Sequence, residues 1–303
     1  MKLFVTGGTG FIGSAVVKKL IAHGHEVTGL SRSTHGDQVL AGLGATSLRG
    51  TLDDLTTLAE AAQQADGVLH LGYNNDFNHY DEAVAQDLAA VKAMLAALAG
   101  SNKPFVNTSG TLMVTDLGRS ATEQDTAPLT GRAVSESLAR QSAQEGVRGM
   151  AVRLSPTVHD EHRQGFGTLL AGLAVQHGQA AYVGEGTTRW PSVHRLDAAD
   201  LFVAALEHGE AGAVYNAAAE TGITVKAIAT TIGQSLKLPI TALTPADAEA
   251  YFGWFTNGIQ QDNPTSSDWT QNALNWHPTH PGLLADLATF LNNPENVAHL
   301  TAH

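Results

Sequence analysis

The sequence predicts an α/β protein with a doubly wound parallel sheet and a smaller carboxy-terminal α/β lobe. An apolar strand near the start of the chain runs into glycines at positions 7, 10 and 13, and a helix follows at once. Strand and helix patterns then alternate as far as residue 154. The strands of this part are almost continuously apolar, which is typical of parallel strands that helices cover on both faces.

The first element is a strand at residues 3–5, and the glycine-rich turn and a helix from Ser14 follow it. Free backbone N–H groups and the positive end of a helix dipole meet at such a turn, so it can bind a pyrophosphate. Glycine lets the turn form, lets the backbone approach the phosphates and lets the helix pack closely on the sheet. The alternative is a turn that is kept for packing alone. The residues expected to bind a dinucleotide here are Gly7, Thr9, Gly10, Phe11, Ile12 and Gly13.

The later elements follow the same alternation. Strands are predicted at residues 26–30, 44–48, 67–71, 104–108 and 149–154. Helices are predicted at residues 55–62, 82–98 and 132–145. Beyond Pro156 we expect helices at 165–177, 197–206 and 283–291, a strand at 213–216, an irregular aromatic stretch at 181–191 and a turn-rich stretch at 251–269. We assign residues 1–155 and 192–217 to a dinucleotide-binding domain, and residues 156–191 and 218–303 to a discontinuous substrate-binding lobe.

Composition argues against several classes of function. The formal charge of −12 disfavours nucleic acid and anionic membranes as partners. Because the chain has no cysteine, disulfides, thiolate catalysis and cysteine-ligated metals are excluded. The histidines form no HxxxH or HExxH pair, so we expect no metal site. The first residues match a strand better than a signal peptide, and the longest apolar run is too short for a membrane span, so we expect a cytoplasmic protein.

Short motifs occur in a fixed order along almost the whole chain. They are TGGTGFIG at 6–13, HLG at 70–72, TSG at 108–110, RLSPTV at 153–158, VHRLDAADL at 193–201 and LNWHP at 274–278. With these motifs the chain resembles the extended short-chain dehydrogenase/reductase family, also called the NAD-dependent epimerase/dehydratase family. The resemblance implies a Rossmann domain, a nicotinamide cofactor and a carboxy-terminal substrate lobe. It also implies that Thr51, Leu52, Gly72 and Pro156 lie along the cofactor.

The catalytic signature of that family is absent. Its YxxxK helix supplies a proton-donating tyrosine and a lysine that holds the nicotinamide ribose. Here Arg132 stands at the tyrosine position and Glu136 at the lysine position. The hydroxyl position of the fifth strand is Gly110, with Ser109 and Thr111 beside it. The chain is therefore an atypical member, and the tyrosinate mechanism does not transfer to it.

Five residues are candidates for the chemistry. Arg132 and Glu136 are four apart on a helix and either form a surface ion pair or act in the cleft. In the cleft, Glu136 would accept hydrogen bonds from ribose hydroxyls, and Arg132 would anchor a substrate oxygen. Ser109 and Thr111 could donate to a substrate oxygen. Tyr73 is the best replacement phenol, unless it only packs against the neighbouring lobe.

Substrate contacts are expected from three residues of the second half. His159 and His194 lie near the expected edges of the cleft, where an imidazole suits acid–base work. Their alternative is a structural role. Trp190 is expected to line an apolar pocket, or else to fill the core of the small lobe.

The end of the second strand favours NADP over NAD. NAD enzymes keep an acidic residue there to bind the ribose hydroxyls. This chain has Ser31 followed by Arg32 and no acid beside them, and both side chains can bond a 2′-phosphate. The alternative is that Arg32 stacks on adenine or faces solvent.

The function expected from these features is NADP(H)-dependent transfer of a hydride to a small activated carbonyl, imine or conjugated alkene. Such an acceptor needs little proton donation, which fits the missing tyrosine. One alternative is a nucleotide-sugar epimerase or dehydratase, and another is a non-catalytic NADP-binding sensor or scaffold. The resemblance also allows a homodimer through the helices at 82–98 and 132–145.

Overall fold

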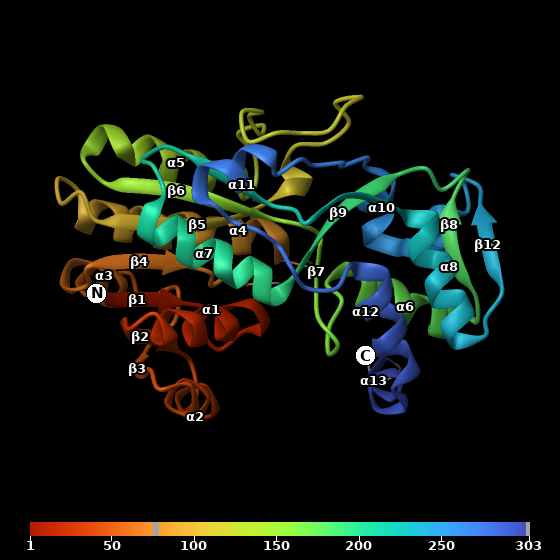
Figure 1. The fold of residues 1–303 in the computed structure, drawn as a ribbon, viewed down its shortest axis with the longest axis horizontal. Helices are drawn as coiled ribbons and strands as arrows, with labels where there is room; N and C mark the ends of the chain where they lie inside the picture. The colour runs from red at the N-terminus through yellow and green to blue at the C-terminus, as the bar shows by residue number, and fades with distance from the viewer. Residues whose placement is uncertain (75–78, 301–303) are drawn as a thin grey trace.

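The computed structural model describes residues 1–74 and 79–300, and within them its main feature is a seven-stranded parallel sheet (Figure 1). Its strand order is β10–β6–β5–β4–β1–β2–β3. The strands are β1 Lys2–Thr6, β2 Glu26–Ser31, β3 Thr46–Arg49, β4 Gly67–His70, β5 Pro104–Gly110, β6 Arg148–Leu154 and β10 Val214–Ala217. The order reverses between β1 and β4, where sheets of this kind bind their ligands beyond the carboxyl ends of the strands. The predicted doubly wound sheet is confirmed.

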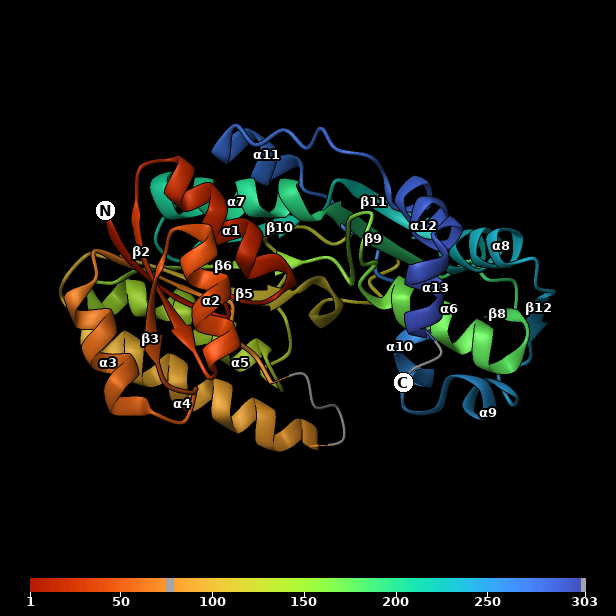
Figure 2. The same cartoon turned by 90° about the horizontal axis from the view of Figure 1, so that it is seen from below.

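Helices cover both faces of this sheet (Figure 2). One face carries α1 Phe11–Ala22, α2 Thr34–Leu43 and α7 Arg195–His208, and the other carries α3 Leu55–Gln64, α4 Tyr80–Leu98 and α5 Ala133–Gln141. Each face has its own apolar core, one around Val16 and Phe202, the other around Met94 and Phe105. The sequence pattern did not predict α2, which begins where the Ser33 hydroxyl accepts a hydrogen bond from the Gly36 N–H.

A second body lies at the other end of the molecule (Figure 1). Its strands are β7 Thr157–His159, β8 Ala180–Val183, β9 Arg189–His194, β11 Glu220–Thr224 and β12 Ile240–Leu243. They form a β11–β9–β7 sheet and a β12–β8 pair. Its helices are α6 Phe166–His177, α8 Val225–Leu236, α9 Ala248–Phe252, α10 Thr256–Gln260, α12 Leu283–Asn292 and α13 Pro294–Leu300. We call this part the small lobe.

Two predictions for the small lobe are wrong. The stretch at 181–191 is not irregular, because it contributes to β8 and β9. The partner of β8 is β12, about sixty residues further along the chain, so no local pattern marks the pair. The turn-rich stretch at 251–269 contains the short helices α9 and α10 and the first residues of α11 Asp268–Leu274.

The two bodies are joined through α7 and β10. Helix α7 follows β9 directly and packs on α1, and β10 pairs with β6 at the edge of the large sheet. Across the described ranges, no helix is both long and apolar enough to cross a membrane.

Candidate functional site

Of the three spaced glycines between β1 and α1, Gly10 is open to a ligand, whereas Gly7 and Gly13 are closed by neighbouring backbone. Gly7 has a φ of +71°, and a Cβ on it would lie 2.6 Å from the Gly72 nitrogen. A Cβ on Gly13 would lie 2.0 Å from the Gly7 carbonyl oxygen. A Cβ on Gly10 would meet only that oxygen, at 3.3 Å. Packing therefore requires glycine at positions 7 and 13, whereas the face of Gly10 is free for a phosphate group. These residues fit the dinucleotide that the fold implies.

Two arginines that the sequence analysis missed lie beside this turn. The guanidinium carbons of Arg195 and Arg163 are 4.7 and 5.7 Å from the centre of the Phe11 ring. Arg195 donates to the Ser14 hydroxyl at 2.7 Å and pairs with Asp160 at 3.0 Å. The guanidinium groups of Arg195 and Arg163 add positive charge where a pyrophosphate would bind.

Two other residues of the turn were also expected to bind a dinucleotide. Thr9 is exposed and Ile12 is half-buried.

The end of β2 carries no free carboxylate. Ser31 is buried, and its hydroxyl donates to the Ser33 carbonyl oxygen at 2.9 Å, which leaves its lone pairs as acceptors. Arg32 is exposed, and no ion pair involves it among the described residues. The next acid along the chain, Asp37, pairs with Arg49.

The other expected cofactor residues lie near the carboxyl ends of the strands. After β3, the backbone N–H and hydroxyl of Thr51 both donate to Asp54, and Leu52 packs on the core. Gly72 donates its N–H to the Thr6 hydroxyl at 3.0 Å. Pro156 leads from β6 into β7, and its carbonyl oxygen accepts the Phe166 N–H at 3.1 Å.

Arg132 and Tyr73 form a stacked pair near the carboxyl ends of β4 and β5. The guanidinium carbon of Arg132 lies 3.9 Å from the centre of the Tyr73 ring. Nη2 of Arg132 donates to the Thr108 carbonyl oxygen at 3.1 Å. Burial raises the pKa of Tyr73 to about 12, although Arg132 opposes the shift. The phenol is therefore protonated at neutral pH. The Tyr73 hydroxyl and Arg132 Nε are buried and have no hydrogen-bond partner among the described residues.

Glu136 does not pair with Arg132, so the predicted ion pair is wrong. Both carboxylate oxygens of Glu136 accept from Arg153, at 2.5 and 2.9 Å. Both side chains are almost completely buried, and Nη1 of Arg153 also donates to the Asp125 carbonyl oxygen. Glu136 lies on the side of α5 that faces the sheet, so its partner comes from β6. A ribose hydroxyl could bond to this carboxylate only by sharing it with Arg153.

The two hydroxyls at the end of β5 have different surroundings. The Thr111 hydroxyl donates to the side-chain oxygen of Asn263 at 2.7 Å, and the Asn263 amide donates to the Thr111 and Val114 carbonyl oxygens. Its proton is thus committed to a structural contact, which corrects the expectation that Thr111 donates to substrate. Ser109 is 2% exposed, and its hydroxyl has no partner among the described residues.

A buried polar chain below these residues was not expected from the sequence. The Thr6 hydroxyl lies 2.7 Å from Nδ1 of His70, and Nε2 of His70 lies 3.2 Å from Asp87. Because the Gly72 N–H already donates to the Thr6 oxygen, we assign the Thr6 hydroxyl as the donor to Nδ1 of His70 and the His70 Nε2–H as the donor to Asp87. The Ser135 hydroxyl donates to the other Asp87 oxygen at 2.5 Å. Burial alone would raise the pKa of Asp87, but His70, Arg132 and Ser135 lower it.

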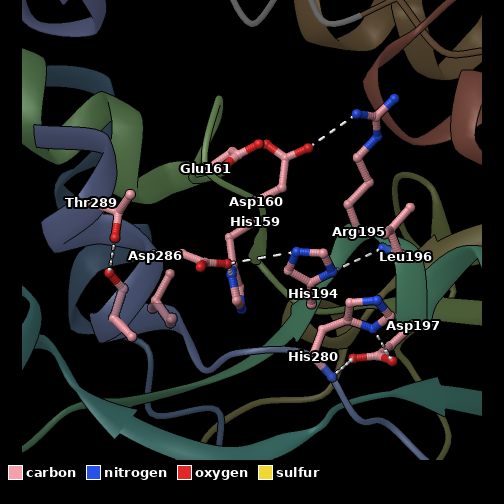
Figure 3. A network of polar contacts seen from close by, with 12 residues as sticks. His159, Asp160, Glu161, His194, Arg195, Leu196, Asp197, His280, Asp286 and Thr289 are labelled. Atoms are coloured by element: carbon pink, nitrogen blue, oxygen red, sulfur yellow. Dashed lines mark hydrogen bonds and ion pairs between the residues drawn. The ribbon is translucent and has the colours of Figure 1, made fainter. Parts of the chain in front are cut away.

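His159 and His194 are buried where the small lobe meets α7 (Figure 3). His159 Nδ1 bonds to Asp286 on α12 at 2.8 Å. His194 Nδ1 accepts the Leu196 N–H, and its Nε2 lies 3.7 Å from Asp286. Burial lowers the pKa of both imidazoles, and for His194 the nearby His280 lowers it further. These contacts match the structural alternative for the two histidines.

His194, Asp197 and His280 come close enough to suggest a metal site. The rings of the two histidines, however, are stacked with centres 4.5 Å apart and planes only 5° from parallel. An imidazole binds a metal in its own ring plane, and no point lies in two stacked planes. His280 Nδ1 bonds directly to Asp197 at 2.7 Å (Figure 3). This geometry makes the trio a pair of stacked imidazoles, one of which is hydrogen-bonded to Asp197.

Trp190 does not line a pocket. Its side chain is fully buried among Phe166 and Phe255 in the core of the small lobe. Its indole N–H donates to the Gln261 carbonyl oxygen at 3.3 Å. The prediction that Trp190 contacts substrate is wrong, and the alternative of core filling is correct.

The sheet order, the glycine turn and the residues at the strand ends define a dinucleotide-binding fold of the Rossmann type. The family model described as "NAD dependent epimerase/dehydratase family" matches residues 3–218, and the chain belongs to this family. The "uncharacterized protein C2A9.02" of Schizosaccharomyces pombe is 42% identical over 95% of this chain and 99% of its own length. A 2-alkyl-3-oxoalkanoate reductase of Stenotrophomonas maltophilia is 32% identical over 39% of this chain and 38% of its own length.

The solved structures agree on the fold. The dTDP-glucose 4,6-dehydratase DesIV of Streptomyces venezuelae, solved with NAD and TYD bound, superimposes with a TM-score of 0.77. The match covers 97% of this chain and 98% of that one at 19% identity. Members of the family bind a nicotinamide dinucleotide and act on small molecules, so the chain is an oxidoreductase-type member of that class.

Proposed function

We propose that the protein is an NADP(H)-dependent reductase that delivers a hydride to a small activated carbonyl, imine or conjugated alkene without a tyrosine–lysine pair. One observation carries this proposal: among the described residues, the side chains around Arg132 and Tyr73 offer hydrogen-bond donors but no free base. The guanidinium of Arg132 has only donors, the pKa of the Tyr73 phenol is about 12, and Arg153 occupies the carboxylate of Glu136. Donors stabilise the negative charge that develops on a reduced oxygen, whereas oxidation of an alcohol requires a base.

The side chains divide the work as follows. Arg132 Nε, which is buried and has no partner within residues 1–74 and 79–300, binds the substrate oxygen or a neighbouring carboxylate. The Tyr73 ring beneath it fixes the plane of the guanidinium. When bound, the reduced cofactor supplies the hydride, and the protein supplies orientation and charge stabilisation. The relative that reduces 2-alkyl-3-oxoalkanoates supports a carbonyl acceptor, since a carboxylate next to the reacting carbonyl would suit Arg132.

We also propose that the cofactor is NADP(H). The support is the surroundings of the β2 terminus, where the exposed Arg32 can bond a 2′-phosphate, no acid stands beside it in the sequence, and Asp37 is paired with Arg49. The Ser31 hydroxyl already donates to the Ser33 carbonyl oxygen, so it has no proton left for the phosphate. A charge-assisted bond from Arg32 is worth roughly 1.5–3 kcal/mol, or about one to two decades in affinity. Arg32→Ala should therefore weaken NADPH binding by about tenfold or more and leave NADH binding almost unchanged. Equal losses for both cofactors would contradict this choice.

The reductase is tested by following NADPH consumption with a panel of 3-oxo acids, aldehydes, imines and enones. Turnover with one of these classes is expected, and Arg132→Met should raise KM for that substrate much more than the matched Arg132→Lys. Turnover of nucleotide sugars alone would establish the epimerase or dehydratase alternative. Tight NADPH binding with no turnover would establish the sensor. The homodimer through α4 and α5 stays a prediction that sedimentation can check.

A further inference from the structure

The strand β5 buries two polar side chains that have no hydrogen-bond partner among the described residues. Asn107 is 0% exposed, and neither the oxygen nor the nitrogen of its amide is bonded. Ser109 is 2% exposed, and its hydroxyl is also unbonded. Residues two apart on a strand point to the same face of a sheet, so both side chains lie on the face that α4 and α5 cover. The candidate active site proposed above does not use Asn107.

The neighbouring polar groups are already paired with one another. In the register of the sheet, Asn107 lies beside His70 of β4, and Ser109 lies beside Arg153 of β6. His70 bonds to Thr6 and Asp87, and Arg153 bonds to Glu136. Among these residues of β4, β5 and β6, Asn107 and Ser109 are therefore the ones whose side chains have no hydrogen-bond partner in the described part of the chain.

Energetics make such a pair unusual. A buried amide without a partner costs roughly 1–3 kcal/mol, so buried polar groups in proteins are almost always bonded to protein or to internal water. The Cα atoms of residues two apart on a strand are about 6.6 Å apart, and side chains on one face can lean toward each other. One water molecule can join their polar atoms if these lie within about 5.6 Å, the reach of two hydrogen bonds of about 2.8 Å. A buried polar site with several partners is where internal water is found.

We propose that Asn107 and Ser109 hold a buried water molecule, and that this water supplies, through the Ser109 hydroxyl, the proton that the reduced substrate oxygen takes up. The inference rests on the proposed reductase and names its missing proton source. When the hydride has added to the carbonyl carbon, the carbon–oxygen π bond is broken and its electron pair is on the oxygen. The Ser109 O–H bond breaks as the substrate O–H forms, and Ser109 recovers a proton from the held water. Bulk water returns a proton to the hydroxide that remains.

The residue types suit this task. An amide does not titrate near neutral pH, and it can donate and accept at once, so Asn107 orients a water without changing charge. A serine hydroxyl is a weak acid by itself, but it can pass a proton on when a second donor stands behind it. Ser109 is the next-to-last residue of β5, whose carboxyl end borders the cleft, and Asn107 is two residues deeper.

The first test does not depend on activity. A crystal structure at high resolution should show a water within hydrogen-bond distance of both the Asn107 amide and the Ser109 hydroxyl. Asn107→Leu, which is similar in volume and cannot bond water, should lack it. Direct bonding of the Asn107 amide to a protein group, or the absence of density between the two side chains, would overturn the proposal. This outcome is distinguishable from failure of the proposed function, which would be a lack of NADPH binding or turnover in the unaltered protein.

The second test measures proton supply. Ser109→Ala and Asn107→Leu should lower kcat by about ten- to a hundredfold, as expected for loss of a general acid, while the Kd for NADPH changes by less than about twofold. A small diffusible acid such as imidazolium should restore part of the rate in Ser109→Ala and have no effect on the unaltered protein.

A matched control is available in the same sheet. Asn216 of β10 is also buried, and its side-chain oxygen has no partner among the described residues, but it lies two strands from Ser109 and its amide donates to the Ser266 carbonyl oxygen. Asn216→Leu should reduce thermal stability and leave kcat at its original value. Two results would overturn the relay. One is full kcat in both Asn107→Leu and Ser109→Ala. The other is a lowered kcat in Asn107→Leu while imidazolium fails to restore any activity to Ser109→Ala.

Discussion

Substitution of the glycines of the first turn separates packing from cofactor binding. In Gly13→Ala the new Cβ would lie 2.0 Å from the Gly7 carbonyl oxygen, where ordinary contact needs more than 3 Å. The helix or the turn has to move by more than 1 Å, which resembles overpacking and costs about 1–3 kcal/mol. For a chain of this size we expect Tm to fall by about 2–12 °C. Helix α1 would also leave the position from which its N–H groups meet a phosphate.

Gly10→Ala should have little effect on stability and a large effect on cofactor binding. Its Cβ would meet only the Gly7 oxygen, at 3.3 Å, so the free energy of unfolding should change by less than about 1 kcal/mol. The methyl group, however, would occupy the face that a pyrophosphate approaches. We expect the Kd for NADPH to rise by at least about tenfold, or about 1.4 kcal/mol. Urea denaturation and fluorescence titration measure the two quantities. A Gly10→Ala protein that binds NADPH as tightly as the original would refute the assignment of this turn.

Two further predictions concern buried charge. Glu136→Gln leaves the Arg153 guanidinium buried without its counter-charge, so the free energy of unfolding, measured by urea denaturation, should fall by about 3–5 kcal/mol. The control Glu161→Gln changes an exposed residue and should alter that free energy by under about 0.5 kcal/mol. Burial lowers the pKa of His159 in the folded protein, whereas in the unfolded chain a histidine has a pKa of about 6.5. Just below pH 6.5 the unfolded chain therefore binds more protons at this residue than the folded protein does. Stability should therefore fall as the pH drops through about 6.5, by at most about 1.4 kcal/mol per pH unit for this residue. His159→Gln should flatten that dependence and the exposed His162→Gln should not. A Glu136→Gln protein of full stability, or an unchanged pH slope in His159→Gln, would contradict these assignments.

The sequence was sufficient where structure depends on local pattern. The spacing of Gly7, Gly10 and Gly13 after an apolar strand predicted the β1–turn–α1 unit, because that unit is built from neighbouring residues. The β–α alternation likewise predicted the parallel sheet. The missing YxxxK pair was also visible, since Arg132 and Glu136 stand at fixed offsets in one helix.

The sequence was insufficient where partners come from distant segments. The spacing of four residues suggested Arg132 as the partner of Glu136. The actual partner is Arg153, seventeen residues away on β6. The periodicity of the sequence does not show which face of α5 meets the sheet. The sequence around Trp190 would look the same whether the side chain lined a pocket or filled a core. Its contacts with Phe166 and Phe255 in the folded protein show that it fills the core. The unpartnered Asn107 could not be recognised either, because the absence of a partner depends on every neighbouring strand and helix.

The central claim is that the glycine turn and the end of β2 bind NADP(H), with the nicotinamide ring next to Arg132 and Tyr73. Parallel titrations of the unaltered protein with NADPH and NADH, followed by energy transfer from tryptophan to the reduced nicotinamide, test it most directly. Saturable binding is predicted for NADPH, at least about tenfold tighter than for NADH. If neither cofactor binds saturably, the claim is false.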